Sequence, residues 1–313
     1  MAQRFAITLT QLTYFAECAK RLNMTVASQE LHVAQSAIST AISHLERTLG
    51  TSLFIRQHAK GLVLTRTGEQ LLQDTHRIFG MLSDSIDSIR ADGGEVRGSV
   101  TVACFKTLAP FLLPLLIGRL QERHPELSVE FIEGDHEETL TSLRSGRAEI
   151  AVNYRLSDPE GISSEHVGDV PPHVVLSTDH PLAGRRTIAL AELADEPLVL
   201  LDLPDSRGYF LDILRSAGIA PRLKYRASSY ETVRSMVAMG LGYSILNQRP
   251  RISGSYTGAE LAAIEISDDV PALEMVISSL AQVNRSARAH AVASAVHEII
   301  AEQPGLSRAP RHD

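Results

Sequence analysis

Residues 26–72 read VASQELHVAQSAISTAISHLERTLGTSLFIRQHAKGLVLTRTGEQLL, and this stretch decides the fold of the N-terminal end of the chain. Apolar residues in its middle recur every three or four positions, which is the spacing of one face of a helix. These residues are Ile38, Ile42, Leu45 and Leu49. Gly50 follows them and is a suitable C-cap, so we predict a helix over residues 34–49.

Further short elements are expected on both sides of this helix. Helical spacing predicts a first helix over residues 9–23, and Thr25 is a good N-cap for a second. Two short apolar runs, residues 53–55 and 62–64, lie on either side of a basic segment and predict a β-hairpin. Three short helices followed by a hairpin form an all-α winged helix-turn-helix, which we assign to residues 1–66.

The third predicted helix carries small polar side chains on the face opposite its apolar stripe. Small hydroxyl side chains let a helix approach the major groove of duplex DNA, and glutamine can bond adenine. A merely solvated face is the alternative, but such faces usually carry Glu and Lys. The basic hairpin would bind phosphate beside the groove. The predicted DNA contacts are Thr25, Gln35, Ser36, Ser39, Thr40, Ser43, His44, Arg56 and Lys60.

The distribution of charge agrees with a DNA-binding end. The chain of 313 residues has a formal net charge of -7. Residues 1–66 hold seven Lys and Arg against three acidic residues, a net charge of +4, which leaves -11 for the remainder. Only a part that faces phosphate gains from positive charge, so a basic end on an acidic body indicates a DNA-binding domain joined to something else.

A long helix is expected after the hairpin. Thr65 or Thr67 would cap it, and it runs to about Ala91, before the linker Asp92-Gly93-Gly94. We assign residues 67–97 to a dimerisation helix and hinge, with an amphipathic helix that packs on its own domain as the alternative. The predicted dimer seam consists of Leu71, Ile78, Leu82, Ile86 and Ile89.

From residue 98 onward, short β-branched runs alternate with helical stretches. This alternation predicts a parallel sheet flanked by helices, an α/β fold. Two lobes are implied within residues 98–303, with lobe I over about 98–165 and 270–303 and lobe II over about 166–269. Residues 304–313 are expected to form a flexible tail.

The carboxyl ends of these strands are where open α/β sheets bind ligands. Lys106 and the start of the helix at Pro110 would favour an anion, so we expect a small carboxylate or polar metabolite. The alternative is that Lys106 is solvated and Thr107 merely caps its helix. The predicted effector contacts are Lys106, Thr107, Gly134, Asp135, Asn153, Asp202, Ser228, Ser229 and Tyr230.

The opening stretch, with LTYFAECAKRLNMT before it, closely resembles the LysR-type transcriptional regulators. Later segments at residues 124–152, 180–183 and 240–246 also look like that family's effector domain. The matching N-terminal residues are Ala27, Leu31, His32, Val33, Gln35, Ala37, Ser39, Ile42, Leu45, Glu46, Leu49, Gly50, Leu53, Phe54, Arg56, Leu64, Thr65 and Gly68.

The resemblance implies a two-lobed, periplasmic-binding-protein-like domain whose lobes are crossed by two strands, with a small molecule in the cleft. It also implies a homodimer or homotetramer on double-stranded promoter DNA, with RNA polymerase as a candidate partner. Ser36 and Thr40 depart from the family's usual Pro and Arg, and Ala148-Glu149 stands where Asp-Leu is common. The operator sequence therefore cannot be copied from relatives.

Other classes of protein fit less well. The twelve histidines form no zinc-helix pattern, and nucleophile elbows and glycine-rich phosphate loops are missing, so we predict neither an enzyme nor a cofactor or metal. The lobes alone would suit an exported solute-binding protein. The DNA-binding end and the lack of a signal segment oppose that, and we expect a cytoplasmic protein without a membrane span.

Overall fold

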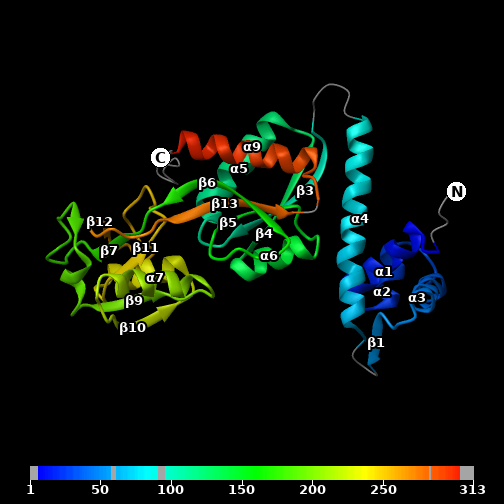
Figure 1. Cartoon of the computed structure of the whole chain (residues 1–313), viewed down its shortest axis with the longest axis horizontal. Helices are drawn as coiled ribbons and strands as arrows, with labels where there is room; N and C mark the ends of the chain where they lie inside the picture. Colours follow the sequence, from blue (N-terminus) through cyan, green and yellow to red (C-terminus); the bar gives the residue numbers. More distant parts are fainter. Residues whose placement is uncertain (1–5, 58–60, 91–95, 282, 304–313) are drawn as a thin grey trace. The chain divides into compact units, whose positions relative to one another are not determined.

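The computed structural model describes residues 6–57, 61–90, 96–281 and 283–303 (Figure 1). The chain forms two compact units. One comprises Met1–Asp92 together with Arg144–Arg147, and the other comprises Gly93–Leu143 and Ala148–Asp313. Each unit is described by itself below.

Three short helices, a hairpin and one long helix make up the first unit. The hairpin strands are antiparallel, with Phe54 opposite Leu64. The elements are α1 (Leu9–Arg21), α2 (Met24–Glu30), α3 (Gln35–Leu49), β1 (Phe54–Gln57), β2 (Gly61–Leu64) and α4 (Arg66–Arg90). This is the winged helix-turn-helix that the periodicity predicts.

One apolar core joins these elements. Phe15 of α1 is fully buried, and its ring lies 5.5 Å from that of Phe54 in the wing. Ile38, Ile42 and Leu45 of α3 enter the same cluster, so the apolar stripe of α3 faces inward. Burial of such side chains stabilises the domain by roughly 1.5–3 kcal/mol each. The polar face of α3 is left outside.

The helix caps differ in one place from the sequence-based expectation. The sequence predicts Thr25 as the cap of the second helix, but Asn23 takes that place, and its side-chain oxygen accepts bonds from the amides of Thr25 and Val26 at 2.9 and 3.2 Å. Asparagine caps at least as well as threonine, so residue type alone does not separate two candidates that lie two positions apart. Thr65 caps α4 by accepting from the Gly68 amide at 3.0 Å.

Gly68 also explains how closely α4 approaches the wing. A Cβ added at this position would lie 2.2 Å from the backbone oxygen of Leu53. Any side chain would therefore push α4 away from the β1 segment. Partly buried Leu71, Leu72 and Phe79 continue the contact of α4 with the core.

Lobe I of the second unit is a five-stranded sheet in the order β4-β3-β5-β13-β6. Val100, Val102 and Cys104 of β3 face one apolar cluster, which α5 and α9 cover, whereas Ala103 faces the other side and packs with Leu143 of α6. Helices thus cover both faces. The elements are β3 (Gly98–Phe105), α5 (Ala109–Arg123), β4 (Leu127–Gly134), α6 (His136–Arg144), β5 (Ile150–Tyr154), β6 (Ile162–Val170), β13 (Leu273–Leu280) and α9 (Ala287–Glu302).

Lobe II holds a four-stranded sheet, β11-β7-β12-β8, and a parallel pair, β9 and β10. Helices α7 and α8 pack with these strands. The elements are β7 (His173–Ser177), β8 (Thr187–Ile188), η1 (Leu190–Leu193), β9 (Pro197–Leu201), α7 (Ser206–Ser216), β10 (Arg222–Ala227), α8 (Tyr230–Ala238), β11 (Ser244–Leu246) and β12 (Leu261–Ile266).

The chain passes between the lobes twice. It leaves lobe I through β6 and enters lobe II as β7, with Pro171 and Pro172 between the two strands, and it returns from β12 to β13. Proline cannot donate to a strand ladder, so this pair ends one sheet before the next begins. In Figure 1 the return is visible where orange β13 lies beside green β6.

The parallel sheet that the sequence predicts is parallel only in part. β3 is parallel to β4 and β5, but β13 runs antiparallel to both β5 and β6, and β7 is antiparallel to β11 and β12. The returning strand reverses direction because it enters lobe I from lobe II. Strands β6 and β12, which sequence reasoning missed, belong to these two crossings.

Gly242 allows β9 to lie against the segment before β11. Its φ is +150°, and a Cβ there would lie 2.1 Å from the backbone oxygen of Pro197. The Tyr243 amide donates to that same oxygen at 2.9 Å. The second glycine of GLGYSIL, Gly242, is therefore required by the close approach of its backbone to that of Pro197.

Candidate functional site

The outward face of α3 presents small polar side chains. Gln35, Ser36, Thr40 and Ser43 are exposed, and Ser39 is half-buried. Thr25, in the first turn of α2, is exposed as well. Ala34 is the N-cap of α3 and makes no side-chain cap bond, which keeps the first amides of the helix without a local side-chain partner.

His44 differs from its neighbours on this face. Its Nδ1 lies 3.1 Å from Nε2 of Gln11 on α1, and 3.4 Å from the Thr48 hydroxyl. The ring is half-buried and fastened between α1 and α3. It therefore helps to set the angle of α3 as well as lining its polar face.

Glu46 joins α3 to the wing, a role that sequence reasoning did not assign. Its Oε1 accepts from the Leu53 amide at 2.8 Å and from the Phe54 amide at 3.4 Å. A carboxylate that accepts backbone amides forms stronger bonds than a neutral acceptor. The signal was available in principle, because Glu46 is the one acid between residues 31 and 68.

The predicted basic contacts of the wing are only partly covered by the structure. The backbone of Arg56 pairs with Leu62 in the hairpin, but the Arg56 side chain and the whole of Lys60 lie outside the described residues. Leu62 also donates its amide to the Leu22 oxygen at 2.9 Å, which fastens the wing to the end of α1.

Helix α4 carries an apolar stripe that its own unit covers only at the start. Leu71 packs on the core of the first unit, in line with the alternative of a helix lying on its own domain. Ile78, Leu82 and Ile86 farther along are 41%, 41% and 39% exposed. The Ile89 side chain lies outside the described residues. Exposed apolar side chains in a row indicate a contact surface.

A small cavity lies where residues of both lobes meet. Its volume is about 20 Å³, enough for one water-sized group. Lobe I contributes residues from the ends of β3, β5 and β13, lobe II contributes residues from β9, α7 and α8, and two come from directly after β11. The lining residues are Phe105, Thr107, Tyr154, Leu201, Leu203, Ser206, Phe210, Tyr230, Asn247, Gln248 and Leu273.

Aromatic rings and hydrogen bonds hold the walls of this cavity in place. Tyr154 packs edge-on against Phe105 at 5.2 Å, and its hydroxyl accepts from Nε2 of Gln248 at 2.9 Å. The Tyr230 hydroxyl donates to the backbone oxygen of Gln248 at 2.5 Å. Burial raises the pKa of both Tyr154 and Tyr230, which keeps both phenols neutral.

Three lining residues keep a buried polar oxygen without a hydrogen-bond partner. They are Ser206 through Oγ, Asn247 through Oδ1 and Gln248 through Oε1. Their residues are 3%, 9% and 2% exposed. Such atoms cost free energy unless something else satisfies them, so the presence of three of these residues in the lining of one cavity indicates a candidate binding site.

Of the predicted effector contacts, Thr107 and Tyr230 line this cavity. The other predicted residues are engaged elsewhere. Nζ of Lys106 lies 3.8 Å from a carboxylate oxygen of Asp135 and of Glu138. Asp135 and Glu138 also cap α6, since each accepts from the other's amide, at 3.0 and 2.7 Å.

The remaining predicted contacts have local roles. Asn153 is buried in lobe I, where it accepts from the Ser278 hydroxyl at 3.2 Å. Asp202 pairs with Arg207 and Arg226, and Ser229 caps α8 by accepting from the Thr232 amide. Gly134 is buried, and Ser228 is exposed; neither is among the lining residues.

Ser206 was missed because sequence reasoning considered only the ends of predicted strands, and the Asn247-Gln248 pair was missed although it directly follows one of them. Ser206 starts α7 after a turn, and the amide pair follows β11. A usable signal was the Asn247-Gln248 pair itself, because two amide side chains directly after a buried strand are candidates for polar contacts at a sheet end.

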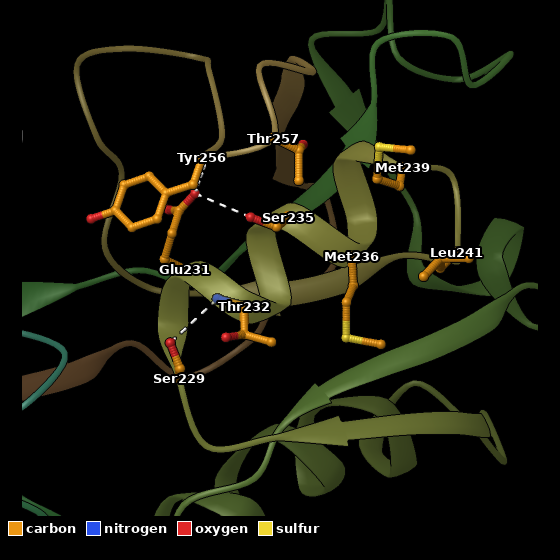
Figure 2. A pocket seen from close by; sticks show the side chains of 9 residues that line it. All are labelled: Ser229, Glu231, Thr232, Ser235, Met236, Met239, Leu241, Tyr256 and Thr257. Carbon is orange, nitrogen blue, oxygen red and sulfur yellow. Dashed lines mark hydrogen bonds between the residues drawn. The ribbon is translucent and has the colours of Figure 1, made fainter.

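A second, open groove lies on lobe II between α8 and the segment at Tyr256 (Figure 2). Its volume is about 350 Å³, and Met239 and Tyr256 are 61% and 92% exposed. Glu231 joins its two sides, since its Oε1 accepts from the Tyr256 amide at 2.8 Å. Among the described residues that line it, none keeps a buried unpartnered polar atom, in contrast to the inter-lobe cavity.

Two other site types have no support in the described part of the chain. No group of three or more His, Cys, Asp and Glu there could hold a metal ion. Within the same residues, the longest apolar helical stretches fall short of what crossing a membrane requires.

Two family models match the chain. Residues 9–69 match the bacterial regulatory helix-turn-helix protein, lysR family, and residues 93–301 match the LysR substrate binding domain. Together they cover the helix-turn-helix with its wing and both lobes.

Known proteins of similar sequence are named as regulators. The uncharacterized HTH-type transcriptional regulator YvbU of Bacillus subtilis is 31% identical over 245 residues, which cover 77% of this chain and 82% of the relative. A probable hydrogen peroxide-inducible genes activator of Mycobacterium leprae is 27% identical and covers 95% of each chain.

Solved structures agree in fold. A LysR family regulator of Pseudomonas aeruginosa, the PA01 protein, matches with a TM-score of 0.64 and 28% identity over 94% of this chain and 99% of its own. A full-length variant of OxyR from the same species matches with a TM-score of 0.77 and 25% identity over 93% and 98%. The chain therefore belongs to the LysR family of transcriptional regulators, as a DNA-binding protein with an effector-binding domain and not an enzyme.

Proposed function

We propose that this regulator controls promoter activity as a homo-oligomer, in response to a small molecule bound in the inter-lobe cavity. The observation that carries the effector site is the convergence of Ser206, Asn247 and Gln248, each with an unpartnered buried oxygen, on one cavity between the lobes. A neutral polar metabolite fits this lining, and it is one of the two classes expected from the sequence, a small carboxylate or a polar metabolite.

The outward face of α3 is proposed to enter the major groove. Gln35 can bond an adenine edge, and Ser36, Ser39, Thr40 and Ser43 are small enough for the backbone of α3 to come close to the bases. Thr25, Arg56 and Lys60 are proposed phosphate contacts beside it. The amides at the start of α3 suit a phosphate as well.

The long helix α4 is proposed to pair two subunits. Ile78, Leu82 and Ile86 would become buried in that pair. Paired winged helices would contact half-sites one or more helical turns apart, and two such dimers would form a tetramer. Effector binding that moves the lobes would change the spacing of these pairs, and with it the access of RNA polymerase to the promoter.

Peroxide sensing through a thiol pair is not the mechanism that we favour, although two relatives are named for peroxide induction or as OxyR. The sequence contains two cysteines, Cys18 and Cys104, and one lies in each compact unit. Both are buried, and burial raises the pKa of Cys18 to about 11 and that of Cys104 further. Buried thiols that stay protonated react slowly with oxidants.

Gel shifts with DNA from the region upstream of the gene test the proposed function. We expect salt-sensitive binding to at least one fragment, with an affinity that falls steeply between about 50 and 200 mM salt, as phosphate contacts require. Because promoter DNA is its target, we also propose that the protein works in the cytoplasm. Absence of salt-sensitive binding to every fragment would contradict the regulator function in this form.

A further inference from the structure

We propose that the group which enters the inter-lobe cavity is an uncharged hydrogen-bond donor, such as a hydroxyl or a primary amide, and not a carboxylate. This inference rests on the proposed function, because it specifies the chemistry of the effector at that site. It replaces the small carboxylate expected from Lys106 and the start of α5.

Asn247 supplies the firmest evidence. Its Nδ2 donates to the backbone oxygen of Val170 at 2.8 Å and to the Tyr209 hydroxyl at 3.0 Å. A backbone oxygen can only accept, so the orientation of the amide is settled by its partner. Oδ1 of Asn247 is therefore the atom without a partner, and it can only accept.

Gln248 repeats this arrangement next to Asn247. Its Nε2 donates to the Tyr154 hydroxyl at 2.9 Å, and its Oε1 has no partner. Its backbone oxygen already accepts from Tyr230. Asn247 thus spends both amide protons on the protein and Gln248 spends at least one, while each keeps an unpartnered oxygen. A ligand that satisfies these two oxygens must supply N–H or O–H groups.

Ser206 adds a hydroxyl from α7 of lobe II. It follows Asp205, whose φ of +65° and ψ of -39° are rare for a residue with a side chain, and the Ser206 amide donates to the Pro204 oxygen at 2.8 Å. This tight γ-turn is strained, and strained turns are usually kept where they position a functional group. Here it places Ser206 at the first turn of α7, buried and with Oγ unpartnered.

The lack of formal charge among the described lining residues argues against a carboxylate or an ammonium group as the ligand. Among the described residues that line the cavity, none carries a formal charge, and Lys106, the cation predicted as an effector contact, is paired with Asp135 and Glu138. Arg234, whose guanidinium lies 5.9 Å from the ring of Tyr230, is paired with Glu231. A carboxylate would bury an anion without a counter-charge and place its oxygens against two acceptors. An ammonium would bury a cation without a carboxylate.

Formamide and formate provide a matched pair of probes. Each has three heavy atoms and one formyl proton, and the end that would enter the water-sized cavity is an NH2 group in formamide and a negatively charged oxygen in formate. We would record saturation-transfer difference NMR on the full-length protein with both probes at equal concentration in one tube. We expect a protein-dependent signal for formamide that exceeds the formate signal several-fold.

Variants at the cavity identify where the signal arises. Ser206→Ala should weaken the formamide signal several-fold, and Ser206→Val, which adds two methyl groups in place of the hydroxyl, should abolish it. Ser244→Ala is the matched control, because Ser244 is also buried with an unpartnered hydroxyl but does not line the cavity. It should leave the signal unchanged.

The melting temperature provides a second measurement, which distinguishes a hydroxyl that binds the ligand from one that only stabilises the fold. Removal of an unpartnered buried hydroxyl is neutral or stabilising, so Ser206→Ala should melt at or above the wild-type temperature while it loses the probe. A lowered melting temperature would show that Ser206 is bonded within the protein and overturn its role here.

The outcomes separate the two levels of the proposal. A formate signal that the Ser206 variants abolish would overturn the donor class and keep the cavity as the effector site. If neither probe gives a signal that depends on Ser206, both the donor class and the assignment of this cavity are wrong. DNA binding in the gel shift tests the regulator function independently of either result.

Discussion

At the scale of single residues, the two candidate sites differ in whether their available polar groups are exposed to solvent or buried. On α3, Gln35 and Thr40 face solvent with their polar groups available. In the cavity, Asn247 and Gln248 keep acceptors that solvent does not reach. The exposed set suits a large, hydrated partner such as duplex DNA, and the buried set suits a small molecule that leaves water behind.

Gln35→Ala should reduce sequence discrimination, because it removes a side chain that bonds a base edge. A loss of about 1–3 kcal/mol in preference for the operator over a scrambled site is expected. Competition gel shifts with the two DNAs measure it. Arg56→Ala provides the contrast, since it should weaken binding to both DNAs and lower the salt slope by about one. A Gln35 variant that keeps its full operator preference would show that another face of α3 contacts the bases.

The expectation that ligands bind at the carboxyl ends of strands identified only part of the candidate effector site. Thr107 follows the apolar strand β3, and Tyr230 follows β10, whose residues alternate between exposed and half-buried, so the place of both at the cavity was predictable from strand patterns. Asn247 and Gln248 directly follow β11, so the same reasoning could have included them, but which strand ends meet at the cavity depends on how the chain crosses between the lobes. Lys106 was predicted to bind an anion because no acidic partner is near it in sequence. Its partners Asp135 and Glu138 follow β4, about 30 residues farther along the chain.

Elements are joined in this protein by a few well-placed polar bonds as well as by apolar cores. The Glu46 carboxylate ties α3 to β1, and the Leu22 oxygen ties α1 to β2. Both bonds hold the wing at a set angle to α3, so a helix and a hairpin can contact DNA as one rigid surface.

Glu46→Ala should destabilise the first unit and loosen the wing. It leaves the amides of Leu53 and Phe54 without their acceptor, and hydrogen bonds to charged groups contribute about 1.5–3 kcal/mol. Denaturant unfolding followed by circular dichroism measures the loss. Glu30→Ala is the control, because its surface ion pair with Arg21 should contribute less than about 1 kcal/mol. Equal losses for both variants would mean that Glu46 is only another surface charge.

Ile86→Asp should dissociate the proposed dimer. The change places a charge in the middle of the exposed apolar stripe of α4, where pairing would bury it. Sedimentation velocity at micromolar concentration should show smaller species than for the wild type. Ser85→Asp adds the same charge one position around the helix and should not change the sedimentation. If Ile86→Asp leaves the assembly intact, the stripe has another purpose.

Elements with a regular apolar spacing were predictable, and those without it were not. The stripe of α3 and the caps Gly50 and Thr65 were recognised because each follows from local chemistry. Strand β6, with the sequence ISSEHVGDV, is mostly polar over its first five residues and is held by pairing with β13. Such a strand is defined by its neighbour, which follows only after the whole of lobe II.

At the scale of the whole molecule, a basic stretch over residues 1–66, which belongs to the first unit, is joined to an acidic remainder. The division of charge, +4 over residues 1–66 and -11 over the remainder, directs DNA toward the first unit and away from the lobes. The family models follow the same division, with residues 9–69 and 93–301 matched separately.

Stability should fall in mild acid because of His173. Burial, with Arg249 and Arg234 as further contributors, lowers the pKa of His173 from 6.5 to about 3 in the folded protein. Above about pH 6.5 the histidine is neutral in both states. Between about pH 6.5 and 3 the unfolded chain binds a proton that the folded chain does not, so the unfolding free energy falls by up to about 1.4 kcal/mol per pH unit.

Urea unfolding at about pH 8, 6 and 5 tests this dependence. His173→Gln removes the titrating group, so its unfolding free energy should change less between the two acidic conditions than that of the wild type. The value at the alkaline condition corrects for any general loss of stability in the variant. Parallel pH profiles for the two proteins would exclude His173 as the source.

The placement of one cysteine in the core of each unit has a practical consequence. Cys18 and Cys104 are both fully buried, so a thiol reagent can label either one only after the surrounding unit has opened. Labelling rates at the two positions, read by mass spectrometry of the intact native protein, would report the opening free energies of the two units separately. Operator DNA should slow labelling of Cys18 in particular, and a cavity ligand should slow labelling of Cys104. The two cysteines would therefore report which of the two units a bound molecule stabilises.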